Sequence, residues 1–317
     1  MNKLLDATTS LAARLDGRLL LHYVESCDST SEQVRELYTV RELSQPVLVC
    51  TDAQPEGRGT RGRSWLMQPG QDIALSLGLP LGPELLPSPR LPLALSVLLA
   101  QSLANLITEQ WRSARLYPRE DAGSGSAEAG SGESVVQAIN QARDGLAERI
   151  CAVKWPNDLL LAQPGADGEL QYRKCGGILV EHLPGLLVIG IGINVNSTAA
   201  DFGPELAGRL STVRDCCGMR LDREALFSGI ALRLYGRLVF NGILQGFSAV
   251  DDSAIRALEP DWQRLDRSSG QRWLMKRDGG IIPVTARHVD FATGHLFVAD
   301  EAGREYEVES YTELENQ

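Results

Sequence analysis

The sequence has no Cys-x-x-Cys pair, the spacing typical of structural zinc sites and of redox-active disulfides. Its 6 cysteines stand at positions 27, 50, 151, 175, 216 and 217, and the last two are adjacent. This arrangement suits neither a disulfide framework nor a metal site. We therefore expect free thiols in a reducing compartment, the cytoplasm.

The chain also lacks an excess of positive charge. It has 31 Lys and Arg residues against 41 Asp and Glu, which gives a net charge of −10 at pH 7. Proteins that bind nucleic-acid backbones gain affinity when clustered cations release counterions. An acidic chain needs a strong local basic patch for this, and its one candidate patch lies in residues 57–63. Nucleic-acid binding is therefore not expected.

Long apolar runs are missing as well. The longest, around residues 93–100 and 186–193, fall short of the roughly 18 residues that a membrane helix needs. The first ten residues carry Lys3 and Asp6 and have no apolar core of signal-peptide length. We predict neither a transmembrane helix nor secretion. Hydrophobic residues at 43% and charged residues at 23% indicate a globular protein with an ordinary core.

Hydrophobic spacing predicts a sheet flanked by helices. Strands are expected at 18–24, 46–51, 72–79, 150–154, 159–161, 177–181 and 186–194, with the last two paired as a hairpin. Helices are expected after Ser29, whose spacing from Glu32 fits a capping box, and at about 93–107, 134–149, 222–240 and 253–265. Residues 121–133 are almost wholly Gly, Ser, Ala and acidic, which predicts a disordered surface insertion.

Beyond residue 268, short predicted strands are separated by Gly-containing turns, which is typical of a small β barrel. We therefore predict an α/β (α+β) fold with a mixed sheet and flanking helices in residues 1–267. A small β domain would follow in residues 268–317.

Residues 57–63 hold three arginines and three glycines. Glycines let a loop close over a ligand, and arginine forks bind phosphate oxygens bidentately. No Gly-Lys-Ser/Thr follows, so the loop is not a Walker motif. The segment favours a phosphate-binding flap, and a solvated basic turn is the alternative.

Two further segments carry polar groups at the ends of predicted strands. One is Lys154-Trp155-Pro156-Asn157-Asp158, which places an amide and a carboxylate where α/β proteins bind ligands, although a purely structural turn would look the same. The other is Lys174-Cys175-Gly176-Gly177, where a lysine beside two glycines suits charge stabilisation in acyl or phosphoryl transfer. Cys175 is a rival candidate, as a nucleophile, but neighbours on a strand face opposite ways, which favours a buried thiol.

The last segment is Gly190-Ile191-Gly192-Ile193-Asn194. Glycines within an apolar strand indicate the close approach of another backbone or of a ligand. Asn194 would offer a donor and an acceptor to the edge of a base.

Taken in order, these motifs resemble the biotin protein ligases in a form without an N-terminal DNA-binding domain. The resemblance rests on Asp28-Ser29-Thr30, the segments 57–65 and 154–158, Lys174 with 177–181, and Gly190 with 192–194. It covers roughly residues 20–310. It implies a biotin/lipoate ligase-like catalytic domain and an SH3-like C-terminal barrel. The implied reaction makes biotinyl-5′-AMP from biotin and ATP, with Mg²⁺, and then biotinylates a lysine of a carboxyl carrier domain.

The resemblance also implies roles for particular residues. Biotin contacts are implied for Ser29, Thr30, Ser31, Gln54, Arg58, Gly59, Thr60, Lys174 and Gly177. Nucleotide contacts are implied for Arg61, Arg63, Trp65, Asn157 and Asn194. Catalytic roles are implied for Lys174, Arg58 and Asp158, of which Asp158 would either orient magnesium or help to deprotonate the acceptor amine. No residue is assigned as a direct protein ligand of a metal.

The sequence departs from the family pattern at several places. Only about 25 residues precede Asp28, too few for a helix-turn-helix module, so we expect no DNA binding. Thr60 stands where some relatives have another arginine. A lipoate or octanoate attachment enzyme and a non-catalytic biotin-binding sensor are the alternative functions. The oligomeric state is left open between a monomer and a homodimer.

Overall fold

The structure is a computed structural model, and it describes residues 3–59, 63–82, 88–116, 150–164, 170–240, 243–245, 249–277 and 279–316. The predicted insertion 121–133 and the predicted helix 134–149 lie outside the described residues.

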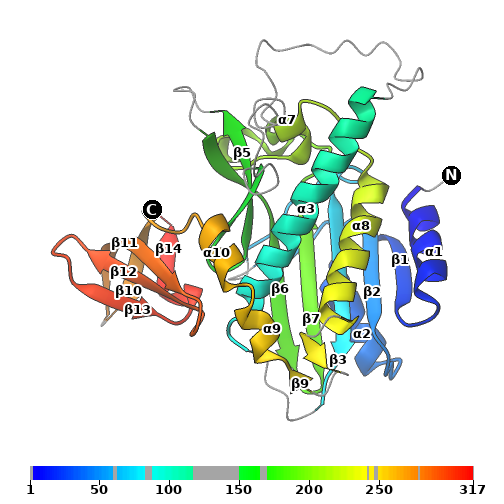
Figure 1. The fold of residues 1–317 in the computed structure, drawn as a ribbon, viewed down its shortest axis with the longest axis horizontal. Coiled ribbons are helices and arrows are strands. Elements are labelled where there is room, and N and C mark those ends of the chain that lie inside the picture. Colours follow the sequence, from blue (N-terminus) through cyan, green and yellow to red (C-terminus); the bar gives the residue numbers. More distant parts are fainter. Residues whose placement is uncertain are drawn as a thin grey trace.

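The larger part of the chain is built on a seven-stranded mixed sheet (Figure 1). Its strand order is β1-β2-β3-β7-β6-β5-β4, in which β1 and β2 are parallel and the other pairs are antiparallel. The strands are β1 (Leu20–Ser26), β2 (Val47–Ala53), β3 (Ile73–Pro80), β4 (Cys151–Lys154), β5 (Asp158–Pro164), β6 (Leu170–Leu183) and β7 (Leu186–Ile193). All seven predicted strands and the β6–β7 hairpin are confirmed.

Helices of very different lengths surround this sheet. They are α1 (Lys3–Leu15), α2 (Thr30–Thr39), α3 (Leu91–Leu116), α6 (Pro204–Ala207), α7 (Val213–Cys217), α8 (Arg223–Tyr235), α9 (Asp252–Arg256) and α10 (Glu259–Leu265). Short 3-10 turns η2 (Ala199–Phe202) and η4 (Tyr311–Glu313), and the π-helical turn η3 (Gly236–Phe240), complete the set with the small hairpin β8 (Leu244–Gln245) and β9 (Ala249–Val250).

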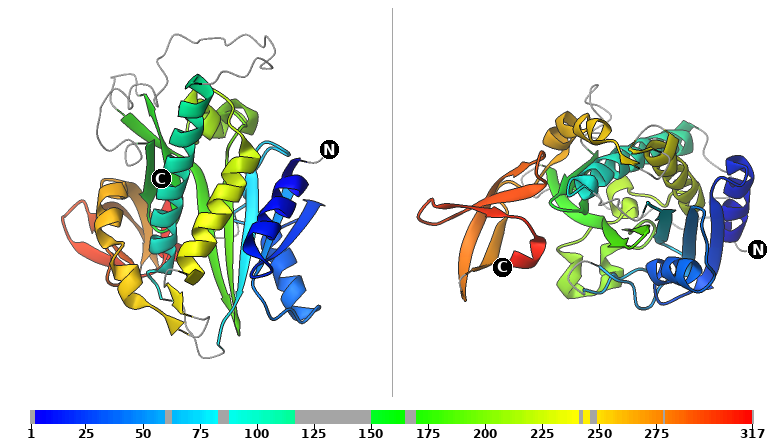
Figure 2. Two further views of the ribbon diagram at one scale, coloured as in Figure 1. Left: turned by 45° about the vertical axis from the view of Figure 1, so that its right-hand side comes forward. Right: turned by 90° about the horizontal axis from the view of Figure 1, so that it is seen from below.

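The two faces of the sheet are covered unequally. Successive strand residues point to opposite faces, so Leu48 and Cys50 of β2 join the main core, whereas Val47 and Val49 join a small second core. The main core lies under α3 and α8, which cross the sheet side by side (Figure 1). The second core lies under α2 alone, on the opposite face (Figure 2). Part of that face is therefore left for a ligand.

Helix α3 is the central core helix. Its segment Leu91–Ser113 is long and apolar enough to cross a membrane, but 78% of its most apolar window is buried inside the protein. As predicted, no unbroken apolar run reaches 18 residues here, because polar residues such as Ser96, Gln101 and Asn105 interrupt the apolar sequence of the helix. Its burial against the sheet and α8 is that of a core helix.

The C-terminal part forms a separate five-stranded antiparallel sheet at one end of the molecule (Figure 1). Its order is β13-β12-β11-β10-β14, with strands β10 (Arg272–Arg277), β11 (Gly280–Asp290), β12 (His295–Asp300), β13 (Glu305–Val308) and β14 (Leu314–Asn316). The β14 residue Glu315 forms an ion pair with Lys276, 2.5 Å long, so the acidic end of the described chain belongs to this sheet.

Three local predictions differ from the structure. Helix α1 was not expected, and it buries Leu4, Leu11 and Leu15. The predicted helix at 253–265 is two helices, α9 and α10, the second with a proline in its first turn. Ser29 does precede α2 as its N-cap, but its side chain makes no capping hydrogen bond. The predicted capping box is therefore absent.

Candidate functional site

The site lies where small residues hollow out the sheet face that α2 leaves uncovered. In β3, the large residues Ile73, Leu75 and Leu77 point into the main core, and Ser76 lies on the opposite face. In β7, Ile189 and Ile191 likewise alternate with Gly190 and Gly192. Side chains as small as these leave room over the strands for another group.

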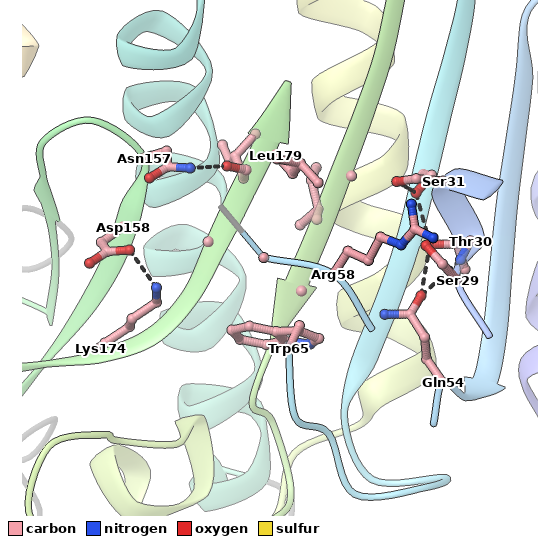
Figure 3. A pocket seen from close by; sticks show the side chains of 17 residues that line it. Ser29, Thr30, Ser31, Gln54, Arg58, Trp65, Asn157, Asp158, Lys174 and Leu179 are labelled. Atoms are coloured by element: carbon pink, nitrogen blue, oxygen red, sulfur yellow. Dashed lines mark hydrogen bonds and ion pairs between the residues drawn. The ribbon is translucent and has the colours of Figure 1, made fainter. Parts of the chain in front are cut away.

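A narrow inner pocket occupies this hollow (Figure 3). We use the name inner pocket for the cavity lined by Ser29, Thr30, Ser31, Gln54, Arg58, Gly59, Trp65, Ser76, Asn157, Asp158, Lys174, Gly177, Ile178, Leu179, Gly190, Ile191 and Gly192. Its volume is about 50 Å³. The predicted biotin residues that the structure describes are all in this set, so residues far apart in the sequence do meet here.

A network of uncharged groups forms one wall of the inner pocket. The Thr30 backbone N–H donates to Gln54 Oε1 at 2.8 Å. Thr30 Oγ1 lies 2.8 Å from Ser76 Oγ, and Ser31 Oγ lies 3.0 Å from the same atom. Hydroxyl groups both donate and accept. This wall therefore suits a ligand that is polar but uncharged.

The inner pocket opens into a larger outer cleft of about 800 Å³. The outer cleft is lined by six cationic side chains, namely Arg63, Lys154, Arg173, Lys174, Arg209 and Arg272. Asp158 is the one carboxylate among its lining residues. Gln271, Trp273 and Leu314 join from the C-terminal part, so both parts of the chain form its walls. In a chain with a net charge of −10, this concentration of positive charge favours a polyanionic ligand.

Lys174 and Asp158 stand at the junction of the inner pocket and the outer cleft. Lys174 Nζ lies 2.5 Å from Asp158 Oδ1, and Lys154 Nζ lies 3.3 Å from Asp158 Oδ2. Burial raises the pKa of Asp158, but the charges of Lys174 and Lys154 outweigh this effect and hold the pKa below its ordinary value. Asp158 is therefore an ionised carboxylate that holds two ammonium groups.

The 155–158 turn is anchored to its surroundings on both sides. Asn157 Nδ2 donates to the Ile178 carbonyl, and the Ile178 N–H donates back to the Asn157 carbonyl at 3.1 Å. The Trp155 N–H donates to Ser268 Oγ at 2.8 Å, and Trp155 Nε1 donates to the Gly294 carbonyl at 2.9 Å. The amide of Asn157 is thus engaged in holding β6, and the turn ties β5 to the C-terminal sheet.

The loop after β2 brings Arg58 and Trp65 over the pocket. The Gly59 N–H donates to the Arg63 carbonyl, and the Trp65 N–H donates to the Gly57 carbonyl, each at 2.7 Å. A Cβ on Gly57 would lie 2.6 Å from the Trp65 carbonyl oxygen, so only glycine allows this approach. The predicted flap residues Thr60 and Arg61 lie outside the described residues.

Trp65 and Asn194 carry polar atoms with unused hydrogen-bonding capacity. Trp65 Nε1 and Asn194 Oδ1 are buried and have no hydrogen-bond partner within the described part of the chain. Both residues line the outer cleft, and the Trp65 indole packs against the backbone of Gly192. A buried polar atom without a partner is costly. These two atoms are therefore candidates for ligand contacts.

Comparison with known proteins identifies the family. The model of the biotin/lipoate A/B protein ligase family matches residues 23–196, more than half of the chain. The chain belongs to this family. The matched segment contains every described candidate residue named above for the inner pocket, but not Arg209 or Arg272 of the outer cleft.

Relatives and solved structures agree with this family. The chain is 28% identical over 212 residues to the bifunctional ligase/repressor BirA of Bacillus spizizenii, and 27% identical over 212 residues to BirA of Bacillus subtilis. Each alignment covers 67% of this chain and 51% of the relative, so the chain spans about half the length of these curated relatives.

Two solved structures share the fold over almost their whole length. The biotin protein ligase of Aquifex aeolicus in complex with biotin and ATP has a TM-score of 0.55 and 21% identity, covering 93% of this chain and 97% of that one. The biotin protein ligase of Leishmania major in complex with biotinyl-5-AMP has a TM-score of 0.52 and 20% identity, covering 92% and 99%. The predicted mixed-sheet fold with a further β unit is confirmed.

Cys175 has the properties of a core residue in this ligase-family chain. Its side chain is fully buried in the main core, and burial raises the pKa of its thiol far above the ordinary value. All six cysteines are free. The predicted buried thiol is confirmed, and the rival nucleophile is not supported.

Sequence reasoning missed several residues of the site. Ser76 interrupts an apolar strand with a buried hydroxyl, a signal that the sequence does contain. Arg209 and Arg272 carry no such local signal, because only the tertiary structure brings them to the outer cleft.

Proposed function

We propose that this chain is a biotin protein ligase. It activates biotin with ATP to biotinyl-5′-AMP and then transfers biotin to a specific lysine of a biotin carboxyl carrier domain, of the acetyl-CoA carboxylase type. The observation that carries the proposal is the junction at Lys174, where an uncharged polar pocket meets a strongly cationic cleft. The reaction joins the carboxylate of biotin, whose ring system is uncharged, to a nucleotide. It therefore needs an uncharged polar pocket next to a cationic cleft.

The inner pocket would take biotin. The ureido group of biotin presents donors and an acceptor without charge, which matches the hydroxyls of Thr30, Ser31 and Ser76 and the amide of Gln54. Ser29 makes no capping bond, so its hydroxyl is not used by α2. Gly177 and Gly59 line the same cavity and would allow the ligand to approach the backbone.

The outer cleft would take ATP. The triphosphate would lie among the cationic side chains, which include Arg63 of the loop and Lys174 of β6 at the junction. Trp65 and Asn194 would contact the adenine, the first by stacking and the second through its unused Oδ1. Arg61, Thr60 and Asn157 remain candidate contacts from the sequence.

Mg²⁺ would accompany ATP. Within the described residues there is no group of three or more His, Cys, Asp or Glu side chains that would hold a metal ion. Magnesium in nucleotide sites is commonly held by phosphates and one or two carboxylates. Asp158 is the single carboxylate that fits this role here, and it is already paired with two lysines.

In the first half-reaction, a biotin carboxylate oxygen attacks the α-phosphorus of ATP and the bond to the departing pyrophosphate breaks. Lys174 would neutralise the charge that develops between carboxylate and phosphate. In the second half-reaction, the acceptor amine attacks the biotinyl carbonyl, the bond from that carbon to the phosphate oxygen breaks, AMP leaves, and the amine proton passes to solvent water. Asp158 would hold Lys174 in place throughout, and its low pKa keeps it able to accept a hydrogen bond from the amine.

The proposed enzyme has two domains. We place the catalytic domain in residues 1–267 and the SH3-like domain in residues 268–317, because Ser268 begins the passage to β10 and contacts Trp155. The free thiols fit the cytoplasm. Assembly as a homodimer is tested by light scattering at several concentrations.

The test is ATP–pyrophosphate exchange with biotin, lipoate or octanoate supplied in turn. We expect exchange with biotin alone, followed by streptavidin-detectable labelling of a purified carboxyl carrier domain when MgATP is present. Exchange with lipoate but not biotin would overturn the assignment in favour of a lipoate attachment enzyme. Binding of biotin without any adenylate in the mass spectrum would instead identify a sensor.

A further inference from the structure

We propose that Glu32 is a positioning residue of the site, and that it holds Arg58 across the inner pocket until a ligand displaces it. The inference rests on the proposed function, because it concerns the entry of biotin and the retention of its adenylate. It arises from the ion pair between Glu32 and Arg58, whose partners come from α2 and from the loop after β2.

Glu32 is free for this role because it does not cap its helix. It stands at the third position of α2, where the sequence predicts a hydrogen bond back to the N-cap. Instead, its Oε1 accepts from Arg35 Nη1 at 2.6 Å and from Arg58 Nη1. The same short helix therefore carries both the pocket hydroxyls and the partner of Arg58.

The Glu32 carboxylate has a second partner on its own helix, Arg35, besides Arg58. Arg35 pairs with Glu32 through Nη1 and with Glu181 of β6 through Nη2. Arg35 therefore positions Glu32, and Arg35 is itself positioned by its ion pair with Glu181. When Arg58 leaves, Glu32 keeps the charge of Arg35 as a partner, so the departure leaves no unpaired carboxylate. An exchange of partners is therefore easier than it would be for an isolated ion pair.

Arg58 is the side chain whose movement would open the pocket. It reaches across the cavity toward Ser31 (Figure 3), and its side chain is 58% exposed. The inner pocket measures about 50 Å³ in this state. An engineered protein cavity of about 150 Å³ binds benzene, and biotin is a larger, bicyclic molecule. Something must move before biotin enters, and an exposed arginine held by one ion pair moves at the least cost.

A phosphate would compete well for the displaced arginine. Partly exposed ion pairs between side chains are weak, whereas an arginine can bind a phosphate through two parallel hydrogen bonds. In the ligand-free protein, Glu32 therefore lowers the affinity for biotin and for biotinyl-AMP by the free energy of its pair with Arg58.

The experiment measures the equilibrium binding of biotin and of chemically synthesised biotinyl-AMP to the full chain, in the wild type and in Glu32→Gln. We expect both dissociation constants to fall by about two- to fivefold in the variant, the range for a partly exposed ion pair. The adenylate should also dissociate more slowly, while kcat for adenylation stays within about twofold. A purely structural defect would instead weaken binding and lower kcat.

Glu36→Gln is the matched control, because it removes the same charge one turn further along α2 at a residue that contacts Gln33 and not Arg58. It should leave both constants unchanged. The double variant Glu32→Gln/Arg58→Ala should bind like Arg58→Ala alone. Unchanged or weaker binding in Glu32→Gln would overturn the proposal. The binding measurements need no turnover, so they stay separate from the function itself, which fails if the wild type makes no adenylate.

Discussion

Lys174 and Asp158 pair across the antiparallel strands β6 and β5, with 2.5 Å between Nζ and Oδ1. Cys175, the next residue after Lys174, lies at an irregularity in the pairing of these strands and points into the core. Asp158 also faces Lys154, so one partly buried carboxylate orients two ammonium groups. The lysine is thereby held at the mouth of the inner pocket before any substrate arrives, which is the preorganisation that electrostatic catalysis requires.

Replacing Lys174 by Ala should lower kcat for adenylation by about 10²- to 10³-fold, the cost typical of removing one charge-stabilising group. The free energy of unfolding should change by about 1 kcal/mol or less, because the side chain is 42% exposed. The measurement is ATP–pyrophosphate exchange with biotin. Lys276→Ala is the control, since it breaks a 2.5 Å ion pair in the C-terminal sheet, away from the cleft lining. Near-normal exchange in Lys174→Ala would remove this residue from its role.

Asp158→Asn should destabilise the protein in a pH-dependent way. The pKa of Asp158 is lowered in the folded protein, so its contribution is fully present above the unfolded pKa of about 3.9 and is lost as the pH falls through the folded value. We expect a loss of about 1–2 kcal/mol at pH 7, since the two lysines are partly exposed. Urea unfolding at pH 7, 5 and 3 checks this. A difference that persists undiminished at pH 3 would contradict it.

Arg58→Ala should allow biotinyl-AMP to escape into solution. Arg58 lines the inner pocket and belongs to the predicted flap, residues 57–63. Without its charge the adenylate loses one phosphate partner, and its dissociation should accelerate by about tenfold. Chromatography of the reaction supernatant measures the released adenylate. Retention equal to that of the wild type would show that Arg58 does not contact the intermediate.

The strands and the faces of the sheet could be predicted because their signal is local. Large and small residues alternate through 73–79 and 189–193, and that alternation separates the core face from the ligand face. The candidate residues on these strands and on the turns between them were found for the same reason, and the structure brings the described ones together.

What could not be predicted depends on tertiary contacts. Glu32 has the spacing of a capping residue, but two arginines are stronger partners than a backbone N–H. Arg209 and Arg272 reach the outer cleft from segments that carry no motif. Helix α1 is a different case, because its buried residues Leu4, Leu11 and Leu15 stand at helical spacing, a local signal that the sequence does contain.

Deleting residues 121–133 should leave activity within about twofold of the wild type. Their Gly, Ser and acidic composition offers little surface to bury, and shortening a surface loop changes its closure free energy by only about 0.6 kcal/mol for each halving of length. Steady-state kinetics with biotin, ATP and a carrier domain test the deletion. A large loss of transfer to the carrier, with adenylation intact, would show that the segment takes part in docking the acceptor.

Alanine substitutions at two glycines of β7, Gly190 and Gly192, should affect the binding of biotin and of ATP differently. A Cβ on Gly192 would collide with the Trp65 indole, whereas a Cβ on Gly190 would lie 2.8 Å from Ser31 Oγ. Gly192→Ala should therefore displace Trp65 and raise the KM for ATP by about tenfold. Because Gly192 and Trp65 also line the inner pocket, the KM for biotin should rise as well, but by less. Gly190→Ala should have the opposite pattern, because it intrudes on the hydroxyl wall of the inner pocket.

Both variants change one hydrogen to a methyl group on the same strand, so each is the control for the other. Their KM values for biotin and ATP, measured by pyrophosphate exchange, decide the outcome. If both variants raise both KM values equally, the effect is a general distortion of β7, and the inner pocket and outer cleft are not separate binding sites. If the two patterns are opposite, then the alternation of glycine and isoleucine along β7 serves two ligands, with the core packing preserved on the other face.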